Sequence, residues 1–142
     1  MGQQQLLLIV LSVIIVGIAV VVGIQTFGTS AAASNQEAVI NDLMNMAARA
    51  QQYYVKPTGM GGGGNQFDGL GLEHMSPVAT GTSEYSNENG TFTIATAGSG
   101  DAVTLQGVGS YKDKDGNVCQ VQMAIGPNSI TNTTITKVAA GE

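Results

Sequence analysis

Few side chains in this sequence could carry out catalysis, and those that could are far apart. The chain has one histidine, His74, and one cysteine, Cys119. A nucleophilic thiol needs a neighbouring base, but His74 lies in a loop-like stretch unrelated to the segment around Cys119. Glu84 and Glu88 stand in a polar stretch without a partner that would give either carboxylate a catalytic task. We therefore expect no enzyme active site and no small-molecule substrate.

Asp113 and Asp115 are two residues apart, a spacing found in calcium-binding loops. Those loops supply further oxygen ligands and end on a distal glutamate, which this sequence lacks at the required position. The dipeptide Asp115-Gly116 is instead typical of a tight hairpin turn. We interpret the segment as a turn, with weak calcium binding as the alternative, and we predict no metal and no cofactor.

Two further motifs have simpler explanations than ligand binding or modification. The consecutive glycines Gly61 to Gly64 follow a predicted helix and lack the Gly-Lys-Ser/Thr ending of a P-loop, so we expect a flexible or closely packed connector. Asn89-Gly90-Thr91 and Asn132-Thr133-Thr134 match the acceptor pattern for N-glycosylation. We interpret both as turn and surface residues, with glycan attachment as the alternative.

The segment around Cys119 alternates between apolar and polar side chains, as strands with one buried face do. Cys119 shares the apolar face with Val121, Met123 and Ile125, so we expect a buried thiol that behaves as a small apolar side chain. A single cysteine cannot form a disulfide within the chain, although small secreted domains often depend on disulfides. Packing between copies of the chain is the expected source of stability instead.

The chain begins with a long segment that carries no charged side chain. There are ten acidic and five basic side chains, and the first of them in sequence is Glu37. Within the uncharged part, residues 6–24 are rich in Leu, Ile and Val and are broken only by Ser12, Gly17 and Gly23. As a helix this run would be about 29 Å long, close to the hydrocarbon thickness of a bilayer. We expect it to enter a membrane at some stage.

A cleaved signal peptide is an alternative explanation for this segment. Signal peptides begin with basic residues, followed by an apolar run of about 7 to 15 residues and a small-residue cleavage site. Residues 1–5 contain no Lys or Arg, and the apolar run is longer than expected, although Ala31 to Ala33 could serve as a cleavage site. We favour a segment that stays on the mature protein.

The remaining chain, about 110 residues, is long enough for one small domain. It has no Trp and few aromatic side chains, and it is rich in Gly, Thr and Asn, which predicts a thin core under a polar surface with few charges. The net charge is −5 at pH 7 and the five basic residues form no cluster. Nucleic acid is therefore not an expected partner.

A second helix with one apolar face is predicted after the apolar run. Ser34 is a candidate N-cap, with Glu37 three residues later as in a capping box. The helix should end near Lys56, because Pro57 disfavours helix at the residue before it. It is either continuous with the apolar segment or loosened around Gly23 and Gly28. Its apolar stripe recurs at three- and four-residue steps and comprises Val39, Leu43, Met46, Ala47, Ala50 and Tyr54.

The sequence after residue 56 predicts a loop region followed by four antiparallel strands. Residues 57–90 contain residues that interrupt regular secondary structure, such as Pro77 and Gly81. The apolar side chains of this region should pack against the C-terminal β domain, which we call the head. These anchors are Phe67, Leu70, Leu72 and Met75. From Thr91 the apolar side chains alternate at period two. The strands are expected around Phe92 and Ile94, around Val103 and Leu105, around Cys119, and over 130–138, with turns at Gly98 to Gly100, Asp115-Gly116 and Gly126 to Asn128.

The predicted fold class is α+β, with a long N-terminal apolar helix that continues into an amphipathic helix and packs on a small four-stranded antiparallel sheet. We divide the chain into the apolar helix 1–28, the amphipathic helix 29–56, the Gly-rich loop region 57–90 and the β head 91–142.

This order of elements resembles the type IV pilin and pseudopilin superfamily. The resemblance implies a subunit that rests in the inner membrane and is then extracted by pilus assembly machinery into an extracellular filament for adhesion, motility or surface interaction. It implies self-association through the N-terminal helix. The residues expected in the filament core are Gln5, Leu6, Leu8, Val13, Gly17, Val20, Gly23 and Ile24.

The family has a glutamate at the fifth position of the mature chain, and this chain departs from that pattern. Gln5 occupies the position if Met1 is the mature start, and Leu7 occupies it if Gly2 ends a minimal leader. No basic leader is seen. The amides of Gln3, Gln4 and Gln5 are then the candidates to set the register between copies. An alternative function is a membrane-anchored protein, or a minor pseudopilin of a secretion system, that binds a partner without polymerising.

Overall fold

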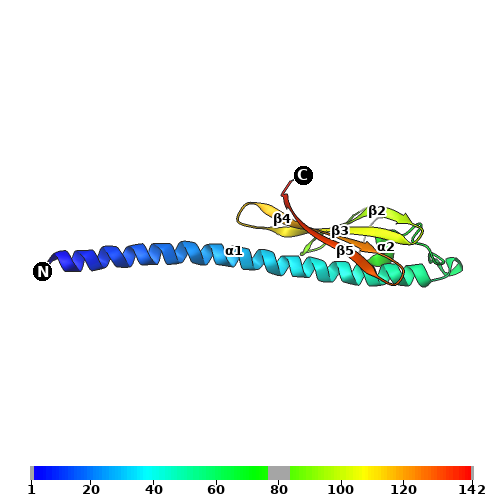
Figure 1. The fold of residues 1–142 in the computed structure, drawn as a ribbon, viewed down its shortest axis with the longest axis horizontal. Coiled ribbons are helices and arrows are strands. Elements are labelled where there is room, and N and C mark those ends of the chain that lie inside the picture. Colours follow the sequence, from blue (N-terminus) through cyan, green and yellow to red (C-terminus); the bar gives the residue numbers. More distant parts are fainter. Residues whose placement is uncertain (1, 77–83, 142) are drawn as a thin grey trace.

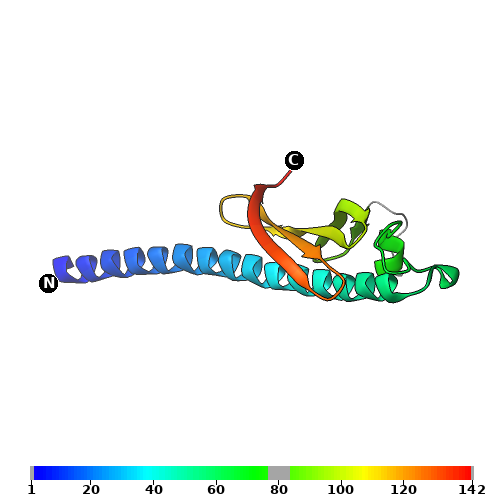
Figure 2. The ribbon, with the colours of Figure 1, turned by 45° about the vertical axis from the view of Figure 1, so that its right-hand side comes forward.

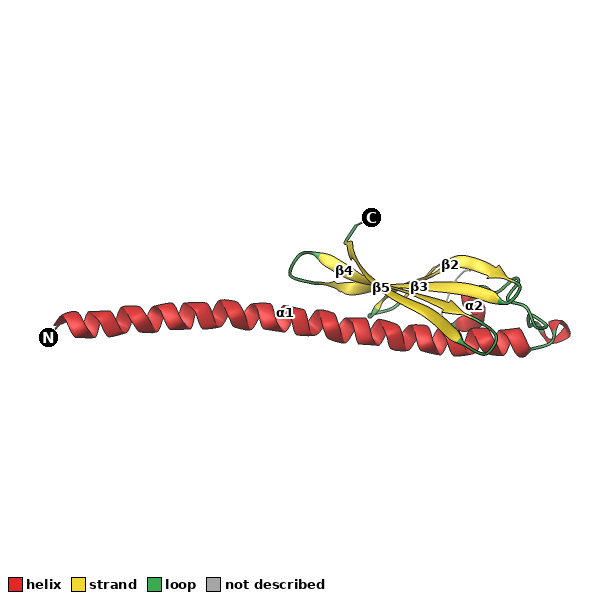
Figure 3. Cartoon of the chain, in the orientation of Figure 1, coloured by secondary structure: helices red, strands yellow, loops and turns green. Residues whose placement is uncertain are grey.

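The computed structural model describes residues 2–76 and 84–141 of the chain. Its longest element is α1, one helix from Gly2 to Val55, and the strands gather on one side of the C-terminal half of this helix (Figure 1). The N-terminal half extends away from this head, so the molecule is a rod with a head along one half (Figure 3). The fold is α+β, as the sequence predicts.

The predicted helix start at Ser34 is wrong, because Ser34 lies well inside α1. The Ala-rich run Ala31 to Ala33 explains the difference, since alanine is the best helix former and carries the helix across this point. Gly23 and Gly28 also lie within the unbroken helix. The apolar and amphipathic segments therefore form one continuous helix, the first of the two alternatives, and its end at Val55 agrees with the end expected near Lys56.

The C-terminal half of α1 packs on the sheet through the predicted apolar stripe. Tyr54, the last member of the stripe, is half-buried against the core. Gly107 and Gly109 of the sheet let the helix approach closely. A Cβ on Gly107 would lie 2.8 Å from the Val39 side chain, and a Cβ on Gly109 would collide with the Asn35 side chain. The buried apolar residues of α1 are Val39, Leu43, Met46, Ala47 and Ala50.

The head is an antiparallel sheet in the order β1-β2-β3-β4-β5. The four predicted strands are present as β2 (Gly90–Ser99), β3 (Ala102–Lys112), β4 (Asn117–Ile125) and β5 (Ile130–Ala139). The predicted count of four is wrong, because β1 (Glu84–Ser86) pairs with β2 and makes a fifth strand. This strand has three residues in a polar stretch, too short for a period-two pattern to predict.

The segment after α1 holds more regular structure than the predicted loop region. It contains a single 3₁₀ turn, η1 (Thr58–Met60), and a short helix, α2 (Leu72–Met75), that packs beside α1. Pro77 and Gly81, two of the predicted chain breakers, lie outside the described residues. The predicted anchors are confirmed as part of the core, because all four side chains are buried: Phe67, Leu70, Leu72 and Met75.

Candidate functional site

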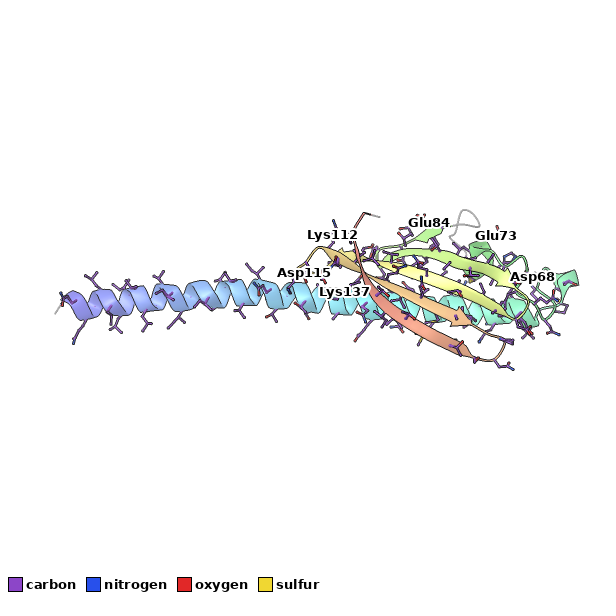
Figure 4. The ribbon with its side chains drawn as sticks, turned by 45° about the horizontal axis from the view of Figure 1, so that its top comes forward. Asp68, Glu73, Glu84, Lys112, Asp115 and Lys137 are labelled. Atoms are coloured by element: carbon purple, nitrogen blue, oxygen red, sulfur yellow. The ribbon has the colours of Figure 1, made fainter. Side chains whose placement is uncertain are left out.

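The N-terminal half of α1 is the largest apolar surface of the molecule, and it contacts nothing in the described part of the chain. An 18-residue window in α1 has a mean hydropathy of 3.3 and is 0% buried, so this one helix is long and apolar enough to cross a membrane. Figure 4 shows the labelled charged side chains on the head, away from this segment. The predicted filament-core residues remain exposed by 56% to 68%, namely Leu6, Leu8, Val13, Val20 and Ile24.

Two hydroxyl groups of this half are hydrogen-bonded within the helix itself. The Ser12 hydroxyl donates to the carbonyl oxygen of Leu8 at 2.7 Å, and the Thr26 hydroxyl donates to that of Val22 at 2.8 Å. Such bonds to the preceding turn are usual for hydroxyl side chains in apolar helices. The segment can therefore enter a dry environment without leaving these hydroxyls unpaired.

Apolar side chains cover every side of this helix, which is typical of a helix surrounded by other apolar matter. Burying one Val, Leu or Ile side chain fully is favourable by about 1.5 to 3 kcal/mol. With more than a dozen such side chains exposed between Leu6 and Ile24, isolation in water is strongly unfavourable. The segment needs either lipid or other copies of the same helix around it.

Gly17 and Gly23 have no packing role within the single chain. A Cβ built on either residue would meet nothing within 4 Å among the described atoms. Glycine costs up to about 1 kcal/mol in a helix relative to alanine. Close approach of a second helix is the benefit that small residues provide in apolar surroundings.

Gln5 lies in the first turns of α1 with its amide exposed. Gln3, Gln4 and Gln5 are consecutive residues in the first turns of α1, and the N-terminal end of this helix lies far from the head (Figure 1). The role of Gln5 in setting the register between copies stays a prediction, because any partner must come from another molecule.

The Asp113 segment is a turn in which the carboxylate already has partners. Asp113 Oδ1 accepts the backbone N–H groups of Asp115 at 2.9 Å and Asn117 at 3.0 Å, and Gly116 has a φ of +80°. The Lys137 ammonium donates to Asp113 Oδ2 at 2.8 Å, and this bond, followed by the backbone bonds, lowers the pKa of Asp113. The hairpin interpretation is confirmed. Within the described ranges, no group of three His, Cys, Asp or Glu side chains could hold a metal ion.

His74 and Cys119 both serve packing. The His74 ring meets the Tyr53 ring edge-on, with centroids 4.8 Å apart. Cys119 is half-buried against the core, so the expectation of a fully buried thiol is corrected to a partly covered one. Burial raises the pKa of the Cys119 thiol and so disfavours the reactive thiolate. The two residues lie on separate elements, α2 and β4.

The four-glycine run closes the C-terminal end of α1. Gly63 N–H donates to the carbonyl oxygen of Tyr53 at 2.8 Å, and Gly64 N–H donates to that of Lys56 at 2.9 Å. These amides would be needed to cradle a phosphate, and they are occupied. A Cβ on Gly63 would also lie 2.9 Å from the Tyr53 ring. The closely packed connector is confirmed over the flexible one.

Asn89 belongs to a polar clamp that the sequence does not reveal. Asp42 Oδ2 accepts the side-chain amides of Asn87 at 2.9 Å and Asn89 at 2.8 Å. The buried Asn35 donates to the carbonyl oxygen of Asn89 at 2.7 Å. The acceptor nitrogen of the first glycosylation pattern is thus engaged with α1. The second acceptor, the side chain of Asn132, lies outside the described residues. Asn35 and Asn89 are 54 positions apart in the sequence, and Asp42 and Asn89 are 47 positions apart, so no local pattern predicts the clamp.

Comparison of this chain with known protein families, with curated proteins and with solved structures finds no match.

Proposed function

We propose that this chain is the structural subunit of an extracellular helical filament of the type IV pilin-like kind. The observation that carries the proposal is the N-terminal half of α1, where the apolar side chains between Leu6 and Ile24 are all exposed. In such a filament the N-terminal helices of many copies pack together at the centre, and the heads form the outer surface. The subunit would rest in a membrane before machinery moves it into the filament, which would serve adhesion, motility or another surface interaction.

The charge distribution supports this arrangement. No charged side chain precedes Glu37, so the whole extended half of α1 can be surrounded by copies of itself without burying an unpaired charge. The head buries only a modest core and has no disulfide, since Cys119 is the one cysteine. Contacts between neighbouring heads would add the stability that such a domain lacks.

The continuity of α1 favours the filament over a plain membrane anchor. An anchor needs about 20 apolar residues and no fixed geometry between the membrane and the head. Here one unbroken helix runs from the apolar segment into the packed core, and this continuity sets the position of the head relative to the segment. A regular array requires this fixed relation. A membrane-anchored protein, or a minor pseudopilin that does not polymerise, is the alternative function.

Negative-stain imaging of material sheared from cells that produce the chain tests the proposal. We expect filaments from the parent and none from Val13→Arg or Gly17→Arg, because a charge in a dry helical core is strongly unfavourable. Glu88→Arg, in the exposed turn between β1 and β2 at the other edge of the sheet, is the matched control and should form normal filaments. Parent cells that carry the protein in the membrane but yield no filaments would support the anchored alternative.

A further inference from the structure

A second exposed apolar surface lies on the head, along the side of the sheet that β5 forms. We call it the β5 flank and define it by Ile40, Met44, Ala48 and Val55 of α1 with Ile130 and Ile135 of β5. Exposed fractions are 50% for Met44, 69% for Val55, 40% for Ile130 and 48% for Ile135. Side chains of this kind are normally covered, and four of them on one side form a patch that calls for a partner.

The sheet register explains why the β5 residues face α1 and yet remain exposed. Ile135 pairs with Val121, and Ile130 pairs with Ile125, so each points to the same face as a buried core residue. On that face, α1 packs mainly against β3 and β4. β5 lies toward the edge of the helix, and Ile130 and Ile135 keep 40% and 48% of their surface exposed.

The α1 members of the flank lie on the side of the helix next to β5. Ile40, Met44 and Ala48 are four residues apart and so follow one line along the helix. Farther along, Ala48 and Val55 line a shallow hollow together with Pro127, in the turn that leads into β5. The Gln51 amide donates to the carbonyl oxygen of Gly126 in that turn at 3.2 Å. In Figure 1 and Figure 2 the start of β5 lies beside this part of α1.

The charges around the flank indicate what it can receive. On the side of α1 that carries the flank, the charge-free stretch is bounded by Glu37 at one end and Lys56 at the other, a separation of about 28 Å. The two charged residues between them, Asp42 and Arg49, lie on another side of the helix, near Met75 and Tyr85. Residues Ile130 to Thr136 of β5 are also uncharged. An occupant should therefore be apolar, uncharged and slightly less than 30 Å long. The segment Leu6 to Ile24 of another copy has all three properties, at about 29 Å.

We propose that the β5 flank receives the apolar segment Leu6–Ile24 of a neighbouring copy. This inference rests on the proposed function and specifies one of its contacts. The apolar segment and the β5 flank are different surfaces on different parts of one chain. Each copy can therefore insert its apolar segment into the flank of one neighbour and receive the segment of another neighbour in its own flank. Such a head-to-tail contact forms a ring if the rotation between neighbouring copies closes after a full turn. Otherwise it propagates as a helical filament.

The positions of the two surfaces fix the displacement between the partners. The middle of the apolar segment lies near residue 15, and the middle of the charge-free stretch lies near residue 46. For parallel copies this difference corresponds to an axial shift of about 47 Å at 1.5 Å per residue. One pair of neighbours in the filament should therefore be staggered by about this distance.

Photo-crosslinking in assembled filaments tests the contact directly. A benzophenone amino acid in place of Met44 should form a dimer whose crosslink maps to residues 6–24 of the second copy. The same probe in place of Asn45, the adjacent exposed residue on another side of α1, is the control and should give little of this product. A Met44 crosslink that maps only to heads, or no dimer in well-ordered filaments, would overturn the inference.

A charge on the flank provides a second readout. Met44→Glu should lower the yield of sedimentable filaments about tenfold or more, because the carboxylate would be buried against apolar side chains. Asn45→Glu should keep the parent yield, and both variants should still enter the membrane. Parent-like filaments from Met44→Glu would refute the flank contact while leaving the filament proposal intact. Absence of filaments from the parent itself would refute the proposed function.

Discussion

At the scale of single residues, this protein has polar groups that hold its shape and few that could do chemistry. The Asp113 carboxylate, the His74 ring and the Cys119 thiol all contact their own chain. The exception is Gln5, whose amide stands at the end of α1 in a setting that other copies would complete. An amide carries no net charge and still offers two donors and an acceptor, so it can be buried without an ionic partner.

Gln5→Leu should leave the subunit in the membrane and yield few or irregular filaments. A polar residue buried among apolar helices can select one register between them, as single asparagines do in coiled coils. The measurement is imaging of filaments from the variant, with their helical order compared to that of the parent. Unchanged yield and symmetry would show that Gln5 only contacts the membrane surface.

The bond between Asp113 and Lys137 predicts how the head responds to acid. Because the folded state lowers the pKa of Asp113, this carboxylate stabilises the fold fully above its ordinary pKa, about 3.9. That contribution is lost as the pH falls through the lowered pKa that Asp113 has in the folded state. Lys137, whose pKa is raised by Asp113, loses its contribution only when the pH rises through the raised value. In thermal unfolding experiments from pH 7 to pH 2, the unfolding temperature of Asp113→Asn should fall less with decreasing pH than that of the parent. Identical acid profiles would contradict this assignment.

At the scale of elements, periodic patterns in the sequence predict which faces of helices and strands are buried. Contacts between residues far apart in the sequence decide where short strands form and which surfaces stay exposed. The stripe from Val39 to Ala50 is buried as its spacing predicts, and the four longer strands lie where their alternation places them. β1 is missed because three polar residues carry no pattern. The helix start at Ser34 is mispredicted because a local capping signal is overridden by helix-forming residues on both sides. The β5 flank depends on which strands α1 covers, which no local pattern contains.

The clamp between α1 and the β1–β2 turn should be a measurable part of head stability. Asn35→Ala removes two hydrogen bonds between α1 and the sheet. One is donated to the carbonyl oxygen of Asn89, which keeps the backbone N–H of Ser110 as a donor at 3.0 Å, and the other is accepted from the backbone N–H of Tyr111 at 3.5 Å. We expect a loss of about 1 to 3 kcal/mol in the free energy of unfolding. Asn45→Ala, at an exposed position of the same helix, should change it by less than about 0.5 kcal/mol. Urea unfolding of both variants measures the difference, and equal values would show that the clamp adds nothing.

At the scale of the whole molecule, the rod divides into a half that folds against its own sheet and a half that has no cover. The head needs α1 from about Asn35 onward, where its first buried residue lies. The half before it supplies the apolar surface that requires lipid or copies.

Removal of residues 1–28 should therefore give a soluble monomer with an intact head. The buried stripe of α1 and its contacts with β3 and β4 all lie in the part that remains. Analytical ultracentrifugation and circular dichroism check the mass and the fold. Filaments formed by this truncated chain would show that the heads assemble without the apolar helix.

The most direct test of the account is a cryo-EM reconstruction of filaments assembled from the full chain. We expect Leu6 to Ile24 to lie in the filament interior, helical and surrounded by other copies, with the heads outside. A reconstruction in which this segment lies at the periphery or in lipid, with the filament held together by head contacts alone, would contradict it.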